Sequence, residues 1–161
     1  MFKRLFILSI ALIGLAQPVL ADRRTPYWAS LRASEVMMRS GPGRQFPAQW
    51  LYRRAGLPVR VVKTYTVSHA EWRQIEDPDG TRGWVQANLL SDQRTALVRG
   101  GMATMHERPE RTARVLWRAE PGVVGKISQC TNGWCLFDVR GRAAHVEIAN
   151  LYGVAPGEAL P

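Results

Sequence analysis

The hydrophobic positions of this chain alternate with polar ones over short stretches and rarely follow the period of an amphipathic helix. The stretches are rich in β-branched and aromatic residues and are separated by Gly, Pro and Asp. The clearest of them are 58–65, 72–76, 82–86, 125–130 and 135–139. Short strands divided by turn residues in this way are typical of a small barrel or sandwich. We therefore expect an all-β protein.

One turn between two of these stretches has a clear chemical basis. In the sequence DPDG at 77–80, Pro78 sets φ for a turn and Gly80 accepts a positive φ. The acidic residues of this region, among them Glu76 and Asp77, are expected at the solvated end of a hairpin. They do not form a calcium loop, because the other ligand positions and the closing Glu are missing.

The two halves of the chain resemble each other, which indicates an internal repeat. The sequence around Trp72 and Asn88 recurs around Trp134 and Asn150, which gives a unit of about 55 to 65 residues. The matched pairs are Tyr52 with Trp117, Arg53 with Arg118, Trp72 with Trp134, Asn88 with Asn150 and Leu89 with Leu151. A duplicated β-module accounts for the chain length better than one large domain.

The N-terminus has the pattern of a cleavable export signal. Lys3 and Arg4 precede an apolar run over 6–16, which is too short to span a bilayer. Cleavage near Ala21 would remove 1–21 as a signal peptide and leave no stable membrane span. The alternative is an uncleaved membrane anchor. Cleavage predicts a periplasmic or secreted protein.

The chain is strongly basic, with a formal net charge of +9. Such a charge favours anionic neighbours, which include an envelope polymer, a membrane surface and nucleic acid. The basic residues are mostly scattered arginines and are not interleaved with aromatic residues as on a nucleic-acid-binding face. In an exported protein we therefore expect an envelope partner and no nucleic acid.

Both cysteines lie in the short sequence CTNGWC at 130–135. In an oxidising compartment the first expectation is a disulfide between Cys130 and Cys135, because the spacer can form a hairpin loop. A loop this short contributes roughly 2 kcal/mol in the chain-entropy model. A metal site is the alternative, but His145 is the only further ligand close in this half.

Two motifs connect the first repeat with a known family. The sequence RSGPG at 39–43 lies near its start, and GWV at 83–85 lies near its end. In these motifs the chain resembles bacterial Src-homology-3-like (SH3-like) domains. The second repeat has HERPER at 106–111 and AHV at 144–146 instead, so its resemblance depends on Trp134 and the stretches beside it.

The resemblance implies two tandem five-stranded SH3-like barrels, each with a one-turn helix before its last strand. These helices are expected at 86–89 and 148–151, and 94–98 would close the first barrel. The expected layout is a signal peptide at 1–21, an N-terminal segment at 22–33, domain 1 at 34–99, domain 2 at 100–153 and a tail at 154–161. Because almost no linker remains, we expect the barrels to touch.

No catalytic constellation is evident in the sequence. His69, His106 and His145 are dispersed, and no spacing suits a metal-binding pair. A thiol nucleophile would need a free cysteine beside a positioned histidine, whereas Cys130 and Cys135 have each other. We therefore expect a protein that is not an enzyme and that uses no metal and no cofactor.

Aromatic and arginine side chains of the first repeat form the candidate binding surface. Aromatic rings offer broad apolar contact, and guanidinium groups pair with carboxylates. The candidate ligand-binding residues are Arg39, Tyr52, Arg53 and Trp72. The alternative for Tyr52 and Trp72 is a position in the core. The alternative for the arginines is a solvated face or ion pairs with Glu35 and Glu71. Trp50 and Trp84 are expected in the core.

The loop after Arg39 is interpreted first as a turn. Gly41 and Gly43 permit its bend, and Pro42 stiffens it. A phosphate-binding loop does not fit, because no Lys-Ser/Thr pair follows.

The resemblance favours a non-enzymatic protein of the cell envelope that binds peptidoglycan stem peptides or another envelope component. The alternative is a protein-interaction or regulatory module that partners a cell-wall enzyme or sensor. A third hypothesis is an accessory chain whose barrels target a separate hydrolase.

Overall fold

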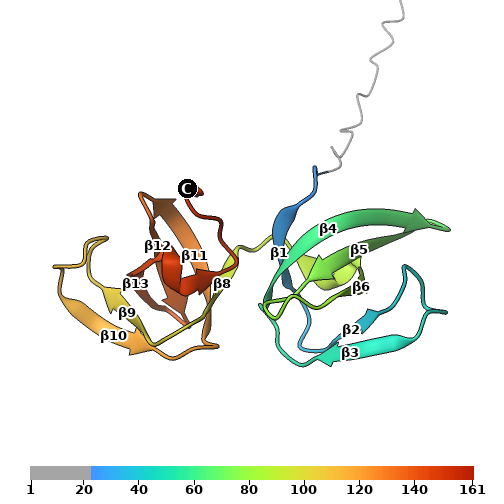
Figure 1. Ribbon diagram of the computed structural model, residues 1–161, viewed down its shortest axis with the longest axis horizontal. Coiled ribbons are helices and arrows are strands. Elements are labelled where there is room, and N and C mark those ends of the chain that lie inside the picture. Colours follow the sequence, from blue (N-terminus) through green and yellow to red (C-terminus); the bar gives the residue numbers. More distant parts are fainter. Residues whose placement is uncertain (1–22) are drawn as a thin grey trace, which may run out of the picture.

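The computed structural model describes residues 23–161, and in that range the protein is all-β, with fourteen strands and two one-turn 3-10 helices. The strands form two separate sheets, and each sheet curls into a small barrel (Figure 1). The predicted fold class and the tandem arrangement are therefore confirmed. Neither helix in residues 23–161 has the length and apolar character needed to cross a bilayer. The signal peptide predicted for 1–21 lies outside the described residues.

The two barrels contain the same series of elements. The first contains β1 (Tyr27–Leu31), β2 (Val36–Arg39), β3 (Ala48–Tyr52), β4 (Pro58–Val67), β5 (Ala70–Glu76), β6 (Arg82–Gln86), η1 (Ala87–Leu89) and β7 (Leu90–Ser91). The second contains β8 (Thr95–Val98), β9 (Ala103–His106), β10 (Val115–Ala119), β11 (Val124–Thr131), β12 (Trp134–Val139), β13 (Arg142–Glu147), η2 (Ile148–Asn150) and β14 (Leu151–Tyr152).

The strand order is also the same in both sheets. The first sheet has the order β3-β2-β6-β5-β4-β1-β7, and the second has β10-β9-β13-β12-β11-β8-β14. Each strand of the second sheet therefore occupies the place of the strand seven strands earlier in the chain. The duplication predicted from the sequence holds for the whole topology, including the two one-turn helices.

Each barrel begins one strand earlier than predicted. The prediction that 94–98 closes the first barrel is wrong, because β8 pairs with β11 and β14 of the second sheet. The segment 22–33 likewise contains β1, which pairs with β4 and β7 of the first sheet. The physical reason is burial: Ala96 and Val98 are fully buried in the second core, and Leu31 is buried in the first.

The C-terminal segment 154–161 is part of the second barrel and not a separate tail. Val154 is buried in the second core. The backbone N–H of Leu160 donates to the carbonyl of Cys130 at 3.0 Å, and that of Gln129 donates to Pro161 at 2.8 Å. The segment therefore continues the sheet beside β11.

Strand pairing and the one-turn helices confirm one predicted match between the repeats and correct three others. Trp72 lies opposite Gln86, the residue before η1, and Trp134 lies opposite Glu147, the residue before η2. These two tryptophans are therefore equivalent, as predicted.

The counterpart of Trp117 is Trp50 and not Tyr52. Trp50 pairs with Met38, and Trp117 pairs with Met105 at the same place in its sheet. At the far end of each repeat, the residue that follows the one-turn helix is buried: Leu90 in the first barrel and Leu151 in the second. The match of Leu89 with Leu151 is therefore wrong by one residue, and so is the match of Asn88 with Asn150.

The glycine of the GWV motif allows two strands to approach closely. A Cβ at Gly83 would lie 2.5 Å from Cγ of Met38, a fully buried core residue of β2. The side chains of Met38, Ile75 and Val85 fill the first barrel beside it. Any larger residue at Gly83 would have to displace this core.

The cysteines form the predicted disulfide across the hairpin of β11 and β12. The Cα atoms of Cys130 and Cys135 are 4.1 Å apart. The turn between the strands uses Asn132 and Gly133, whose φ values of 50° and 83° suit a two-residue hairpin turn. The disulfide fits an oxidising compartment.

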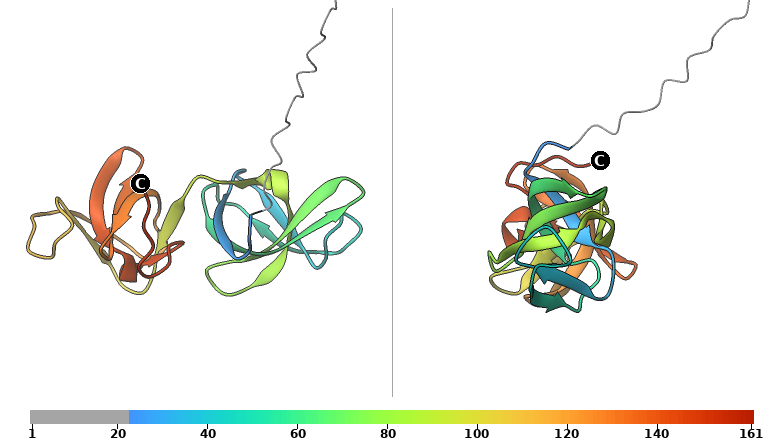
Figure 2. Two further views of the ribbon diagram at one scale, coloured as in Figure 1. Left: turned by 90° about the horizontal axis from the view of Figure 1, so that it is seen from above. Right: turned by 90° about the vertical axis from the view of Figure 1, so that its right-hand side faces the viewer.

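The two barrels lie side by side (Figure 2), and side chains bring them into contact, as expected from the short connection. The hydroxyl of Tyr152 donates to the carbonyl of Glu76 at 3.0 Å, and the hydroxyl of Ser30 donates to the carbonyl of Gln93 at 2.9 Å. Leu97 and Val124 of the second barrel pack against the first core. Burial thus continues across the junction.

Candidate functional site

A row of side chains crosses four strands on the outer face of the first barrel. Arg39 of β2 lies opposite Trp84 of β6, Trp84 lies opposite Gln74 of β5, and Gln74 lies opposite Lys63 of β4. We call these four residues the cross-strand row. Arg39 and Lys63 form no ion pair with a carboxylate among residues 23–161. The row therefore combines two cations, an amide and an indole.

Aromatic rings extend the cross-strand row along the hairpin of β4 and β5. The ring of Tyr65 is 51% exposed and contacts Trp84 edge to face, with 6.2 Å between the centroids. Trp72 lies opposite Tyr65 in this hairpin but is buried, with 3% exposure. Trp72 therefore lies beside the row on the same face of the sheet, but it is buried and does not offer its ring to a ligand.

The loop between β2 and β3 borders the row and is stabilised by its own backbone. The N–H of Ser40 donates to the carbonyl of Pro47 at 3.1 Å, and Nη1 of Arg39 donates to the carbonyl of Phe46 at 2.8 Å. A Cβ at Gly41 would lie 2.4 Å from the ring of Phe46. A Cβ at Gly43 would meet only the flexible side-chain amide of Gln45.

Neither glycine of this loop has a positive φ. The bend predicted for Gly41 and Gly43 therefore does not depend on the left-handed conformation. Gly41 is needed because an aromatic ring packs on its Cα, and Gly43 is the less constrained of the two. Pro42 lies between them in the turn.

The corresponding loop of the second barrel has the same backbone hydrogen bonds without the glycines. The N–H of Glu107 donates to the carbonyl of Arg114 at 2.9 Å, which corresponds to the bond from Ser40 to Pro47. Nδ1 of His106 is 3.0 Å from the carbonyl of Ala113, which corresponds to the bond from Arg39 to Phe46. The loop shape is therefore retained although its RSGPG motif is not.

The loop of the second barrel is bonded to two histidines on its outer face. His106 and His145 are paired at the positions of Arg39 and Trp84. His106 is buried, and Nδ1 of His145 lies 3.2 Å from the carbonyl of Glu107. The second barrel therefore has two loop-bonded histidines at the place where the first has a guanidinium group and an indole.

A bidentate ion pair joins the second loop to β13. Nε and Nη2 of Arg111 donate to the two carboxylate oxygens of Glu147 at 2.7 and 2.8 Å. The hydrogen bond from Arg111 lowers the pKa of Glu147 below its ordinary value. In the first barrel the equivalent positions are Arg44 and Gln86, and a neutral amide offers no such ion pair.

Tyr52, a predicted ligand-binding residue, is a buried structural residue. Its hydroxyl donates to Oδ2 of Asp77 at 2.9 Å, and burial together with this hydrogen bond raises its pKa. Oδ1 of Asp77 accepts the backbone N–H groups of Asp79 and Thr81 at 3.0 and 2.8 Å. Asp77 is therefore buried in the turn and not solvated as predicted, while Gly80 has the expected positive φ of 83°.

The structure separates the other predicted site residues. Arg39 lies in the cross-strand row, but Arg53 lies at the opposite end of β3, 3.5 Å from Glu35 in an exposed ion pair. Trp50 is 60% exposed, so its predicted core position is wrong. Trp84 is half-buried in the row.

Two residues of the row could have been found from alternation alone. In β6, Gly83 and Val85 are buried, so Trp84 between them must face outwards. In β4, Lys63 and Tyr65 are exposed at alternating positions and share the outer face. Gln74 had no distinguishing signal in the sequence.

Comparison with known proteins places this architecture in a family. The fold is similar to solved structures of NlpC1 and NlpC2 from Trichomonas vaginalis, at 11% and 12% identity and a TM-score of 0.34 for each. The matches cover 87% and 81% of this chain but 50% and 49% of those chains, so the chain spans about half their length. A comparison with curated protein sequences found no match. The family model described as Bacterial SH3 domain matches residues 32–92 and 99–153, which together make up more than half of the chain. The chain therefore belongs to the bacterial SH3 domain family.

Proposed function

We propose that this protein is a non-enzymatic binding protein of the cell envelope, in the periplasm or outside the cell. Its first barrel binds peptidoglycan stem peptides, or another envelope component with carboxylate groups, through the cross-strand row. The observation that carries the proposal is the contrast between the barrels. The first barrel presents two cations and an indole in this row, whereas the second has His106 and His145 at the same place, both bonded to its own loop.

The chemistry of the row suits an extended anionic peptide. Arg39 and Lys63 lie at the two ends of the row and can pair with carboxylates of one ligand. Trp84 and Tyr65 offer apolar contact between them. The high net charge of +9 adds a general attraction to an anionic envelope polymer.

The absence of catalysis remains a part of this proposal. Cys130 and Cys135 are joined in a disulfide, so neither offers a thiolate nucleophile. In residues 23–161 no three His, Cys, Asp or Glu side chains cluster in a way that could hold a metal ion. The proposed role therefore depends on binding alone.

Co-sedimentation with purified sacculi tests the proposal. At low salt we expect retention of the wild-type protein, and roughly tenfold weaker retention for Lys63→Glu and for Tyr65→Ala. Arg118→Glu is the matched control, because Arg118 is an exposed cation on β10 of the second barrel. No retention of the wild type, or equal retention of all variants, would contradict the proposal.

A further variant adds a carboxylate beside the row without removing any of its residues. Gln86→Glu supplies the carboxylate that Arg111 has in the second barrel, so that Arg44 can form the equivalent ion pair and compete with a ligand at the row. We expect this variant to lose retention in parallel with Lys63→Glu. A stoichiometric protein partner that co-purifies without any sacculus binding would instead favour the interaction module.

A further inference from the structure

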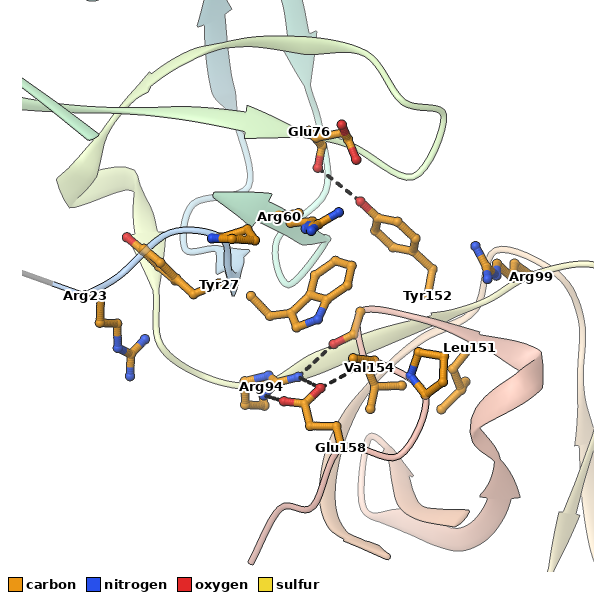
Figure 3. A pocket seen from close by; sticks show the side chains of 15 residues that line it. Arg23, Tyr27, Arg60, Glu76, Arg94, Arg99, Leu151, Tyr152, Val154 and Glu158 are labelled. Carbon is orange, nitrogen blue, oxygen red and sulfur yellow. Dashed lines mark hydrogen bonds and ion pairs between the residues drawn. The ribbon is translucent and has the colours of Figure 1, made fainter. Parts of the chain in front are cut away.

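A pocket of about 690 Å³ lies at the junction of the two barrels (Figure 3). One wall comes from β1, β4 and β5 of the first barrel, and the other comes from β14 and the segment after it. The volume is within the range of small-molecule sites, about 300–1,000 Å³. Because both barrels supply walls, the pocket needs the intact chain.

Aromatic side chains give the pocket a fixed apolar surface. Trp28 and Tyr152 meet edge to face with 5.0 Å between their centroids and an interplanar angle of 84°. The hydroxyl of Tyr152 is held by the carbonyl of Glu76 at 3.0 Å. Tyr27 and Val154 line the same space. A flat apolar group would therefore find a preformed contact surface.

Most of the charged side chains that line the pocket already have partners. The ion pairs are Arg23 with Asp92, Arg82 with Glu76 and Arg94 with Glu158. Two lining guanidinium groups remain, those of Arg60 and Arg99, and neither forms an ion pair with a carboxylate of residues 23–161. The pocket therefore carries a positive charge that the described part of the chain does not neutralise.

These two guanidinium groups come from different barrels and approach the same ring. Arg60 lies opposite Trp28 in the pairing of β1 with β4, and Arg99 follows β8 of the second barrel. Figure 3 shows them on either side of Tyr152. Burial raises the pKa of the Tyr152 phenol, and the positive charges of Arg60 and Arg99 act against that rise. Both charges are thus close to one aromatic wall.

We propose that this pocket is a second binding site, which takes a small ligand with a carboxylate or phosphate group beside a flat apolar moiety. Arg60 and Arg99 attract the oxyanion, because planar guanidinium groups suit such anions. The apolar part contacts Trp28 and Tyr152. The site is separate from the cross-strand row, whose residues do not line this pocket.

Chemical-shift mapping of the full-length mature chain tests this site with three probes. Hippurate carries a carboxylate beside an aromatic ring, hippuramide is its uncharged amide, and phenyl phosphate carries the alternative oxyanion. We expect saturable shifts at Trp28 and Tyr152 with hippurate, with phenyl phosphate or with both, and none with hippuramide. The stronger of the two anions identifies the oxyanion that the pocket prefers.

Variants separate the charge from the fold. Arg60→Gln and Arg99→Gln remove exposed charges, and each should weaken binding of the anionic probe roughly tenfold. Arg118→Gln is the control and should leave binding unchanged. The proposal is overturned if neither anion shifts the pocket residues, if hippuramide binds as well as hippurate, or if the double variant of Arg60 and Arg99 binds normally. Lys63→Glu, which tests the cross-strand row, should not affect this binding.

Discussion

Tyr152 offers a direct test of how strongly the two barrels stabilise each other. It belongs to the second barrel, but its hydroxyl donates to the carbonyl of Glu76 in the first at 3.0 Å. Its ring also contacts Trp28 of the first barrel edge to face. Tyr152→Phe removes only the hydrogen bond, and Tyr152→Ala removes both interactions. The two variants therefore divide the contact into its polar and apolar parts.

The expected losses follow from these contacts. A neutral hydrogen bond of this kind contributes about 1 kcal/mol to the free energy of unfolding, so Tyr152→Phe should lose about that much. The aromatic pair and the partly buried ring add roughly 2 kcal/mol, which makes the loss for Tyr152→Ala about 3 kcal/mol. For a protein of this size each kcal/mol lowers the Tm by about 2–4 °C.

Urea denaturation followed by circular dichroism measures both values. Tyr65→Phe is the matched control, because the Tyr65 ring is 51% exposed and its hydroxyl forms no hydrogen bond within residues 23–161. We expect Tyr152→Ala to separate the unfolding of the barrels into two transitions. If Tyr152→Phe were as stable as Tyr65→Phe, and Tyr152→Ala still unfolded in one unchanged transition, Tyr152 would not couple the barrels and the reasoning would be wrong.

Three further predictions concern single features. Gly41→Val should lower the free energy of unfolding by about 1–2 kcal/mol, because its Cβ meets an aromatic ring. Gly43→Val should lower it by less than about 0.5 kcal/mol. Urea denaturation distinguishes the two variants, and equal losses would contradict the argument. Replacing Cys130 and Cys135 by Ala should destabilise the second barrel by about 2 kcal/mol, and reductant should then have no further effect on its unfolding. Burial raises the pKa of Glu158, but hydrogen bonds from its arginine partner and a backbone N–H outweigh this, so that the net pKa lies below 4.5. The ionised Glu158 therefore stabilises the fold above pH 4.5, and this stabilisation is lost as the pH falls through the lower pKa of the folded protein. Glu158→Gln should remove this part of the pH dependence of the free energy of unfolding. An unchanged pH dependence in the variant would refute the prediction.

Alternation and turn residues were sufficient to predict several of the strands, but not β1 or which barrel each strand joins. The stretch at 94–98 alternates as a strand should, and its partners β11 and β14 lie far along the chain. Local pattern contains no information about such distant pairing. The repeat itself could have corrected the assignment, because β1 precedes the first barrel motif just as β8 precedes the second.

The candidate site was predicted only in part, for a physical reason that differs between residues. Tyr52 and Trp72 have side chains that suit either a surface or a core, and their burial depends on partners elsewhere in the chain. For Tyr52 that partner is Asp77, which also fixes the turn after β5. Trp84 was assigned to the core from its residue type, although the burial of its two neighbours places it on the outer face.

One difference in charge distinguishes the outer faces of the two barrels. The two loops have the same internal hydrogen bonds, so their backbones do not explain the difference. Each loop has an arginine at the same position, Arg44 in the first barrel and Arg111 in the second. Arg111 pairs with the carboxylate of Glu147, whereas Gln86 at that place has no charge to hold Arg44. A duplicated barrel can therefore keep its fold and its loop backbone while the side chains on its outer face diverge.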